Sequence, residues 1–271
     1  MYRIFDLHND YFLKLKSDNK KNKYVTKGAN QNIISAIWTS NLNARESMFE
    51  IEEARNFVSK HEHLFLGVED LHFLSKNNMD KFLAFRPVYA GLTWNTTNCL
   101  AGGAHESGKL TAFGKLAIKN LEKNNIKIDT AHLNEESFLD VAKTTENPLF
   151  CSHTAVYGIQ PNTRNLKDYQ IKMIIDSGGL LGLCLVSEFL NGTNYSKIND
   201  DVSHIDYIAC KFGIDNLALG TDFYGTSHLP KSMKTYSDLT SKLSLALEKL
   251  GYTEKAIDKI FFENANKFLL G

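Results

Sequence analysis

The chain has 271 residues, of which 43% are hydrophobic and 23% are charged, as is typical of a globular protein that buries a core. Its 31 basic and 31 acidic residues give a formal net charge of zero, which argues against nucleic acid or an anionic membrane as the main partner. No apolar stretch approaches the roughly 20 residues that span a bilayer, and the start of the chain lacks the pattern of a signal peptide.

Short runs of β-branched or aromatic residues alternate with longer amphipathic stretches along the chain. Eight such runs predict strands, at 2–6, 32–39, 64–69, 87–93, 126–131, 148–152, 180–186 and 216–221. The segments between them predict helices with one apolar face. The last long helical face contains Leu239, Leu243, Leu247 and Leu250. Asn134 and Thr253 stand where the N-caps of two helices are expected.

Eight strands separated by helices, without a Pro/Gly-rich linker, predict an α/β fold, a (β/α)8 TIM-type barrel that forms a single domain over residues 1–271. An open doubly wound sheet is the alternative. The polar, Lys/Asn-rich segment 16–31 predicts an exposed loop. Long polar segments also follow the predicted strands at 87–93 and 180–186, where loops of an active site are expected.

The four cysteines are widely spaced and include no CxxC pair. This spacing favours free thiols over a disulfide framework, and it predicts a cytoplasmic protein. The cysteines are Cys99, Cys151, Cys184 and Cys210.

Acidic residues and histidines gather at the predicted ends of five strands, where the side chains of a barrel converge on one face. They are His8 and Asp10, Glu69 with its neighbour Asp70, His132, His153 and Asp222. Alternation along the strand favours Glu69 over Asp70 as the side chain at the strand end. The pattern predicts a metal centre.

Three imidazoles with several carboxylates suit Zn²⁺ or a similar divalent first-row ion better than Ca²⁺ or Mg²⁺. The ligands are too many for one catalytic ion with an open position, so we expect two ions, about 3.5–4 Å apart and bridged by a carboxylate. Such a pair would hold a bridging hydroxide and polarise a carbonyl group. The predicted reaction is therefore hydrolysis of an amide, an ester or a related bond.

Six motifs, in order, resemble the renal or membrane dipeptidase family of zinc metallopeptidases, which have an amidohydrolase-like barrel. The motifs are DLHND, GVED, LTWNTTN, IDTAHLNEESF, FCSHTAVYGIQPNTRNLKDYQIKMIIDSGGLLGL and LALGTDFYG, and they run from Asp6 to about Gly225. The resemblance implies that His8 and Asp10 hold one zinc ion and that His132 and His153 hold the other. Glu69 would bridge the two ions and so take part in catalysis.

The resemblance also implies roles for two residues that do not bind metal. Asp222 would handle the proton of the attacking water and later that of the leaving amine. Arg164, in NTRNLKD, would bind the free carboxylate of a dipeptide, a task that suits a planar guanidinium. Members of the family cleave dipeptides, including some with a D-residue at the C-terminal position, and are often homodimers. A dipeptide substrate and a homodimer are therefore expected here.

Two positions depart from the family pattern. Trp94 replaces a histidine that binds substrate and stabilises the developing oxyanion, and an indole can only donate a hydrogen bond. The loss of one oxyanion donor can cost about 10²–10³ in rate, unless Asn95 or Asn98 replaces it. Tyr224 stands where the family commonly has an aspartate. These differences affect the identity of the substrate, and Trp94 and Asn95 are its predicted contacts together with Arg164.

Two other functions fit the same residues. One is a different amidohydrolase-type activity, such as that of a deacylase or a lactonase, which would not need Arg164 for a free carboxylate. The other is a metal-binding barrel without catalysis, which the replacement at Trp94 favours. The presence of Asp222 argues against this second alternative, because binding a metal does not require a carboxylate that transfers protons.

Overall fold

The computed structural model describes residues 2–18 and 30–271, so most of the predicted exposed loop at 16–31 lies outside the described residues. Eight strands follow one another in chain order around a closed barrel, and parallel pairing of β1 with β8 closes the circle. This confirms the (β/α)8 barrel and all eight predicted strands. The strands are β1 Ile4–Asn9, β2 Gln31–Trp38, β3 Leu64–Glu69, β4 Tyr89–Gly91, β5 Lys127–Asp129, β6 Phe150–Thr154, β7 Leu180–Leu183 and β8 Leu217–Leu219.

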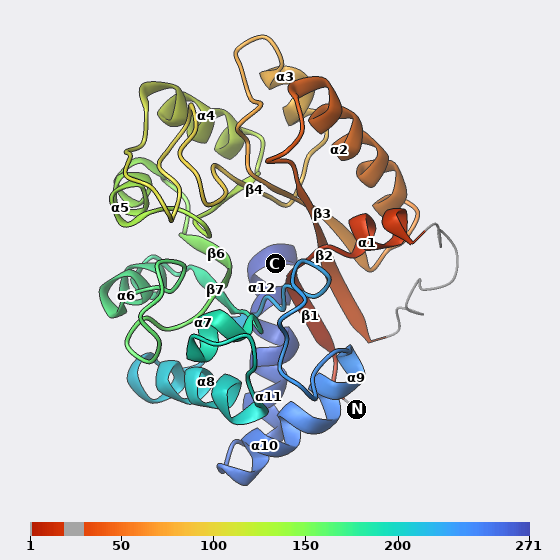
Figure 1. Ribbon diagram of the computed structural model, residues 1–271, viewed down its shortest axis with the longest axis vertical. Coiled ribbons are helices and arrows are strands. Elements are labelled where there is room, and N and C mark those ends of the chain that lie inside the picture. The colour runs from red at the N-terminus through yellow and green to blue at the C-terminus, as the bar shows by residue number, and fades with distance from the viewer. Residues whose placement is uncertain (1, 19–29) are drawn as a thin grey trace. The chain divides into compact units, whose positions relative to one another are not determined.

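Helices separate the strands, as the alternation predicts (Figure 1). The α-helices are α1 Tyr11–Ser17, α2 Ala44–Val58, α3 Met79–Leu83, α4 Ala112–Lys123, α5 Glu135–Thr144, α6 Asp168–Asp176, α7 Ser187–Asn191, α8 Ile198–Phe212, α9 Tyr236–Asp238, α10 Ser244–Lys249, α11 Glu254–Asp258 and α12 Asn264–Leu270. Two π-helical segments continue α9 and α11, namely η1 Leu239–Leu243 and η2 Lys259–Glu263.

The local helix signals are confirmed at both predicted N-caps. The side chain of Asn134 accepts a hydrogen bond from the backbone of Ser137, and that of Thr253 accepts one from Ala256. Three residues of the last predicted apolar face, Leu239, Leu243 and Leu247, are buried. The prediction is wrong at Leu250, which is the C-cap of α10 and is 56% exposed.

The chain forms two compact units. The first unit consists of Met1–Asn9, Val25–Ile33 and Cys151–Gly271, and the second consists of Asp10–Tyr24 and Ile34–Phe150. Strands β2 and β6 each contain residues of both units. A single domain over residues 1–271 stays a prediction.

In the first unit, β8 pairs with both β7 and β1, and the segments η2 and α12 at the end of the chain pack against β1 and β8. Gly182 and Gly220 allow a close approach of the chain here. A Cβ atom at either position would overlap the backbone oxygen of Ser152 on β6. The lack of side chains at the two glycines therefore leaves room for the strand that carries His153.

In the second unit, β4 pairs in register with β3 and β5, and α2 packs against β3. The helix begins with a capping box, in which Asn43 and Glu46 satisfy each other's backbone amides. Its buried face contains Met48, Ile51, Ala54 and Val58, as the helical period predicts.

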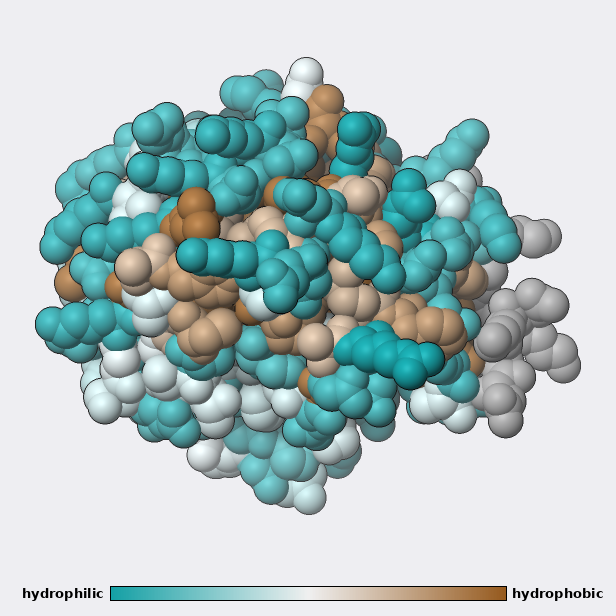
Figure 2. Space-filling model, turned by 90° about the horizontal axis from the view of Figure 1, so that it is seen from above, coloured by the Kyte–Doolittle hydropathy of each residue, from teal (hydrophilic) through white to brown (hydrophobic). Residues whose placement is uncertain are grey.

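Hydrophilic side chains cover most of the face drawn in Figure 2, with a smaller apolar area among them. None of the helices in the described ranges 2–18 and 30–271 is both long enough and apolar enough to cross a membrane. All four cysteines are free thiols, and two of them, Cys151 and Cys184, are buried.

Candidate metal centre

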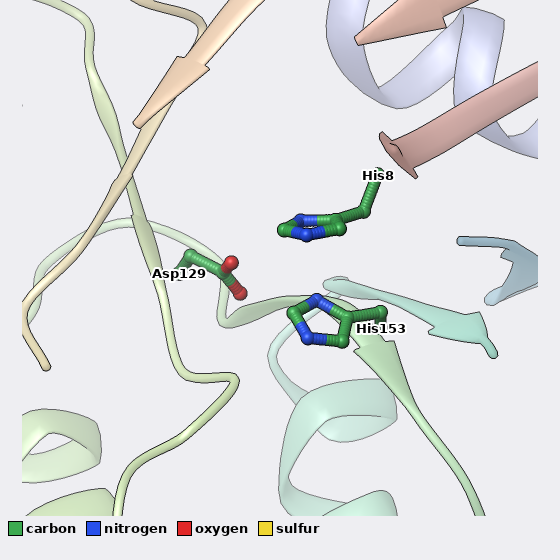
Figure 3. A group of neighbouring side chains, drawn as sticks. All are labelled: His8, Asp129 and His153. Carbon is green, nitrogen blue, oxygen red and sulfur yellow. The ribbon is translucent and has the colours of Figure 1, made fainter. Parts of the chain in front are cut away.

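Two buried histidines face each other in the first unit (Figure 3). His8 lies on β1 and His153 on β6, with ring centroids 3.8 Å apart and an angle of 36° between the rings. Burial, assisted by the positive charge of Arg164, lowers the pKa of His8 to about 3. The imidazole of His8 is therefore neutral at pH 7, which is the form that binds a metal ion.

Both ring nitrogens of His153 have partners in the first unit. A hydrogen bond of 2.8 Å joins Nδ1 to the Ser152 hydroxyl, and Nη2 of Arg164 donates to Nε2 over 2.9 Å. The Arg164 guanidinium is buried and lies over the ring of Phe189, and its Nε atom has no hydrogen-bond partner among the described residues. The guanidinium of Arg164 therefore occupies the position at Nε2 of His153 that a bound ion would take.

Asp222 follows β8 in a conformation that is unusual for a residue with a side chain. Its φ is +58°, and its backbone amide donates to the carbonyl oxygen of His8 over 2.9 Å. A carboxylate oxygen of Asp222 lies within 4.8 Å of a ring nitrogen of His8. Left-handed backbone at a non-glycine residue costs of the order of 1–3 kcal/mol and is concentrated at functional sites. The strained turn directs this partly exposed carboxylate toward the histidine pair.

A buried carboxylate, Asp6, ties the ends of β1 and β8 together. It accepts hydrogen bonds from the amide and the hydroxyl of Thr221, at 2.8 and 2.6 Å, and from the Tyr236 hydroxyl at 2.6 Å. Burial raises the pKa of Asp6, although these hydrogen bonds counteract the rise. The network fixes the chain just before both His8 and Asp222. The sequence analysis missed this role, and no local signal singles out Tyr236.

The second unit contains a buried carboxylate and imidazole pair. Oε1 of Glu69, at the end of β3, lies 2.7 Å from Nε2 of His132, and Oδ1 of Asn95 lies 2.8 Å from Nδ1 of the same ring. The φ of His132 is +66°, and its carbonyl oxygen accepts hydrogen bonds from Thr93 and from the amide of Ala104. Two contacts therefore hold the strained backbone of His132, and two more hold its ring.

Asp10 adds a second carboxylate to this unit. Burial, and then the negative charge of Glu69, raise its pKa well above the ordinary value. Two buried carboxylates that repel each other favour a bound cation, because a divalent ion reverses this electrostatic cost. The neighbouring residue Asp70 has a different role, since its oxygens accept hydrogen bonds from Ser40 and Asn98. The preference for Glu69 over Asp70 as the metal ligand stays a prediction.

Trp94, which departs from the family pattern, belongs to an aromatic pair in the second unit. Its ring lies 6.0 Å from that of His132, and it packs edge-on against Trp38 at 5.3 Å. The indole N–H of Trp38 is buried and has no hydrogen-bond partner within the described part of the chain. Asn98 is engaged with Asp70 and the Leu92 carbonyl, so it is the weaker candidate to replace the missing histidine.

Asp129, the third residue labelled in Figure 3, was missed by the sequence analysis. It is the last residue of β5 in the second unit, is 2% exposed, and accepts a hydrogen bond from the amide of Ala131. The predicted strand ran to residue 131, two residues too far, which hid this carboxylate inside the strand. The sequence signal that could have identified Asp129 is its position three residues before His132.

The residues present fit a divalent first-row metal. Each unit contains its own group of such side chains, His8 and His153 in the first and Asp10, Glu69 and His132 in the second, all of them less than a tenth exposed. Imidazole nitrogens with carboxylate oxygens are the ligand set of catalytic zinc. The two carboxylates, Asp10 and Glu69, are costly to bury in their ionised forms unless a cation compensates their charge.

Solved structures with a similar fold include a metallopeptidase and an amidohydrolase. A metallopeptidase from Rhodobacter sphaeroides, liganded with a phosphinate mimic of the dipeptide L-Ala-D-Ala, matches with a TM-score of 0.85 at 19% identity over 99% of both chains. An amidohydrolase from Pseudomonas aeruginosa matches with a TM-score of 0.81 at 20% identity, over 99% of this chain and 95% of its own. At such identities these likenesses show the fold alone.

Comparison of amino-acid sequences gives information beyond the fold, because it identifies relatives of the chain. A Klebsiella pneumoniae protein named for the pqqA 5′ region is 32% identical over 186 residues, which are 64% of this chain and 68% of its own. A Schizosaccharomyces pombe protein named as an uncharacterized dipeptidase is 25% identical over 204 residues, which are 71% of this chain but only 49% of its own. The family model described as membrane dipeptidase, peptidase family M19, matches residues 28–269. The chain therefore belongs to the membrane dipeptidase family and is an enzyme of the metal-dependent dipeptidase type.

Proposed function

We propose that this enzyme hydrolyses the peptide bond of dipeptides at a dinuclear zinc centre. The observation that carries the proposal is the buried pair of Glu69 and His132, with 2.7 Å between Oε1 and Nε2 and with the other ring nitrogen already engaged by Asn95. This arrangement presents one carboxylate and one imidazole nitrogen to a shared cation. The proposed ligands are His8, Asp10, Glu69, His132 and His153.

Two bound ions would lower the pKa of a water molecule between them and polarise the carbonyl group of the substrate. Asp222 would accept the proton of the attacking water and deliver it to the leaving amine. The support for this role is its partly exposed carboxylate close to His8, on a strained turn that is held by the His8 carbonyl. A positioned acid–base group of this kind contributes about 10²–10⁴ to a rate.

Arg164 would bind the C-terminal carboxylate of the dipeptide. Its guanidinium is buried, it stacks on Phe189, and its Nε atom has no hydrogen-bond partner among the described residues. A buried guanidinium with an unused donor is suited to a carboxylate in a fixed orientation. Trp94 and Asn95 are the other proposed substrate contacts.

Replacing Arg164 tests this assignment. We expect Arg164→Met to raise KM for a dipeptide about 10²-fold, because the loss of a buried charge partner costs about 2–5 kcal/mol. The same variant should change little with an amidated dipeptide, which has no free carboxylate. Steady-state kinetics with both substrates make this comparison, and Arg45→Met, on the exposed surface of α2, is the control. An equal loss with both substrates would assign Arg164 to His153 instead.

Wild-type enzyme tests the proposed function as a whole. We expect about two zinc ions per chain by elemental analysis, and turnover of a panel of L-L and L-D dipeptides. The L-D members belong in the panel because a similar fold binds a mimic of L-Ala-D-Ala. Two bound ions with turnover only of acylated amino acids or lactones would favour the deacylase or lactonase alternative. Absence of bound zinc after reconstitution would overturn the proposed metal centre.

Cellular location and assembly complete the proposal. A cytoplasmic enzyme is consistent with four free thiols, and a homodimer is carried over from the family resemblance alone. Both stay predictions, as do the absence of a nucleic-acid partner and of a membrane partner.

A further inference from the structure

We propose that Asn95 is a positioning residue that fixes the tautomer and the ring orientation of His132, so that Nε2 of this ring stays available to a metal ion. The inference deepens the proposed function and rests on its metal centre. It assigns to Asn95 a task at the metal ligand rather than at the substrate alone.

The hydrogen bond itself determines the tautomer. An amide oxygen only accepts, so Oδ1 of Asn95, 2.8 Å from Nδ1 of His132, requires the hydrogen to be on Nδ1. Nε2 then offers its lone pair, and it lies 2.7 Å from Oε1 of Glu69. A lone pair and a carboxylate oxygen at this distance repel each other unless a proton or a metal ion lies between them. With the hydrogen of Nδ1 held by Asn95, the position between Nε2 and Glu69 is the one that either a second proton or a metal ion must take.

The backbone around Asn95 is held firmly enough for such a task. Its carbonyl oxygen accepts a hydrogen bond of 2.9 Å from the amide of His105. A Cβ atom at Gly103 would come within 2.5 Å of the Asn95 carbonyl carbon, so only glycine allows this close approach of the chain. The side chain of Asn95 thus extends from a fixed point.

The His132 ring is confined on its other sides as well. Trp94 packs against the imidazole at a centroid distance of 6.0 Å, and the Thr93 hydroxyl donates to the His132 carbonyl oxygen over 3.2 Å. These contacts restrict the position of the ring, but none of them distinguishes its two nitrogens. Asn95 does distinguish them, because its Oδ1 accepts a hydrogen bond from Nδ1 alone. Zinc-bound histidines commonly have such an acceptor at the ring nitrogen that does not bind the metal.

The proposed role leaves the other end of the amide unassigned. Nδ2 of Asn95 has no hydrogen-bond partner within the described residues, and the side chain is half-buried. Substrate contact through Nδ2 and support of His132 through Oδ1 are therefore compatible. The test below separates them, because it measures the metal and the imidazole rather than turnover.

The experiment compares Asn95→Ala and Asn95→Asp with wild type and with Thr96→Ala, an exposed neighbour that serves as the matched control. Zinc affinity is measured by competition with a chromophoric chelator, and the imidazole tautomers are measured by ¹⁵N NMR. Asn95→Ala should weaken the binding of one zinc ion about 10–100-fold and mix the tautomers of one histidine. Asn95→Asp should restore both, because a carboxylate also accepts from Nδ1–H. Thr96→Ala should behave like wild type.

Unchanged zinc affinity and an unchanged imidazole spectrum in Asn95→Ala would overturn the positioning role while leaving the proposed function intact. A wild type that binds no zinc would overturn the proposed function and this inference together. If Asn95→Ala fails to fold, Asn95→Leu retains the volume without an acceptor and is measured instead. Lost turnover with unchanged metal binding and spectrum would assign Asn95 to the substrate alone.

Discussion

Glu69→Gln is expected to abolish retention of at least one zinc ion and to lower dipeptide turnover by at least about 10³-fold. The carboxylate is 7% exposed, lies 2.7 Å from Nε2 of His132, and adds to the cost of ionising Asp10 in the same unit. A neutral amide would relieve the repulsion in the metal-free protein but would bind the ions poorly. Ions that activate water and polarise a carbonyl supply several kcal/mol, and about 1.4 kcal/mol corresponds to tenfold in rate.

Zinc retention is measured by metal analysis after dialysis, and turnover is measured by steady-state kinetics with a dipeptide. Thermal unfolding of the metal-free protein provides an internal check on the loss of charge repulsion. The unfolding temperature of metal-free Glu69→Gln should equal or exceed that of the wild type, because the repulsion with Asp10 is gone. Glu52→Gln, exposed on α2, is the control for the loss of one negative charge. Retention of both ions with normal turnover would remove Glu69 from the metal centre.

Asp222→Asn is expected to keep the bound zinc and to lower kcat by about 10²–10⁴, with little change in KM. The carboxylate lies at the strained turn after β8, near His8, and it is partly exposed, so it can exchange protons with both substrate and solvent. Asparagine tolerates the left-handed conformation that φ of +58° requires, so the turn should remain intact. What is lost is the ability to accept and return a proton.

The measurements are zinc content, kcat and KM, together with the pH dependence of kcat. Asp215→Asn, an exposed aspartate in the same unit, is the matched control. A variant that loses zinc would make Asp222 a metal ligand, and a fully active variant would contradict the proton-transfer role.

The two predictions separate the two alternatives to a dipeptidase. A barrel that binds metal without catalysis should lose zinc in Glu69→Gln but show no activity that Asp222→Asn could lower. A lactonase should be sensitive to both variants and indifferent to Arg164→Met.

The sequence by itself determined the barrel and the approximate positions of its eight strands. Strand and helix periods are local signals, since alternation along a strand or the 3.6-residue turn of a helix places each side chain relative to its neighbours. For this reason the strand at 64–69 was predicted with both ends correct, and Asn134 and Thr253 were predicted as caps. Boundaries were less secure where a strand ends in polar residues, as at Asp129.

Only the tertiary structure decided which partner each polar side chain has. Asp6 and Tyr236 are 230 residues apart in the chain, and Asn95 and His132 are 37 apart, so no local period relates them. The contact of Arg164 with His153 likewise depends on the path of the segment after β6. Local periodicity determines the face on which a side chain lies, whereas hydrogen-bond partners and the backbone strain at His132 and Asp222 arise when distant segments pack together.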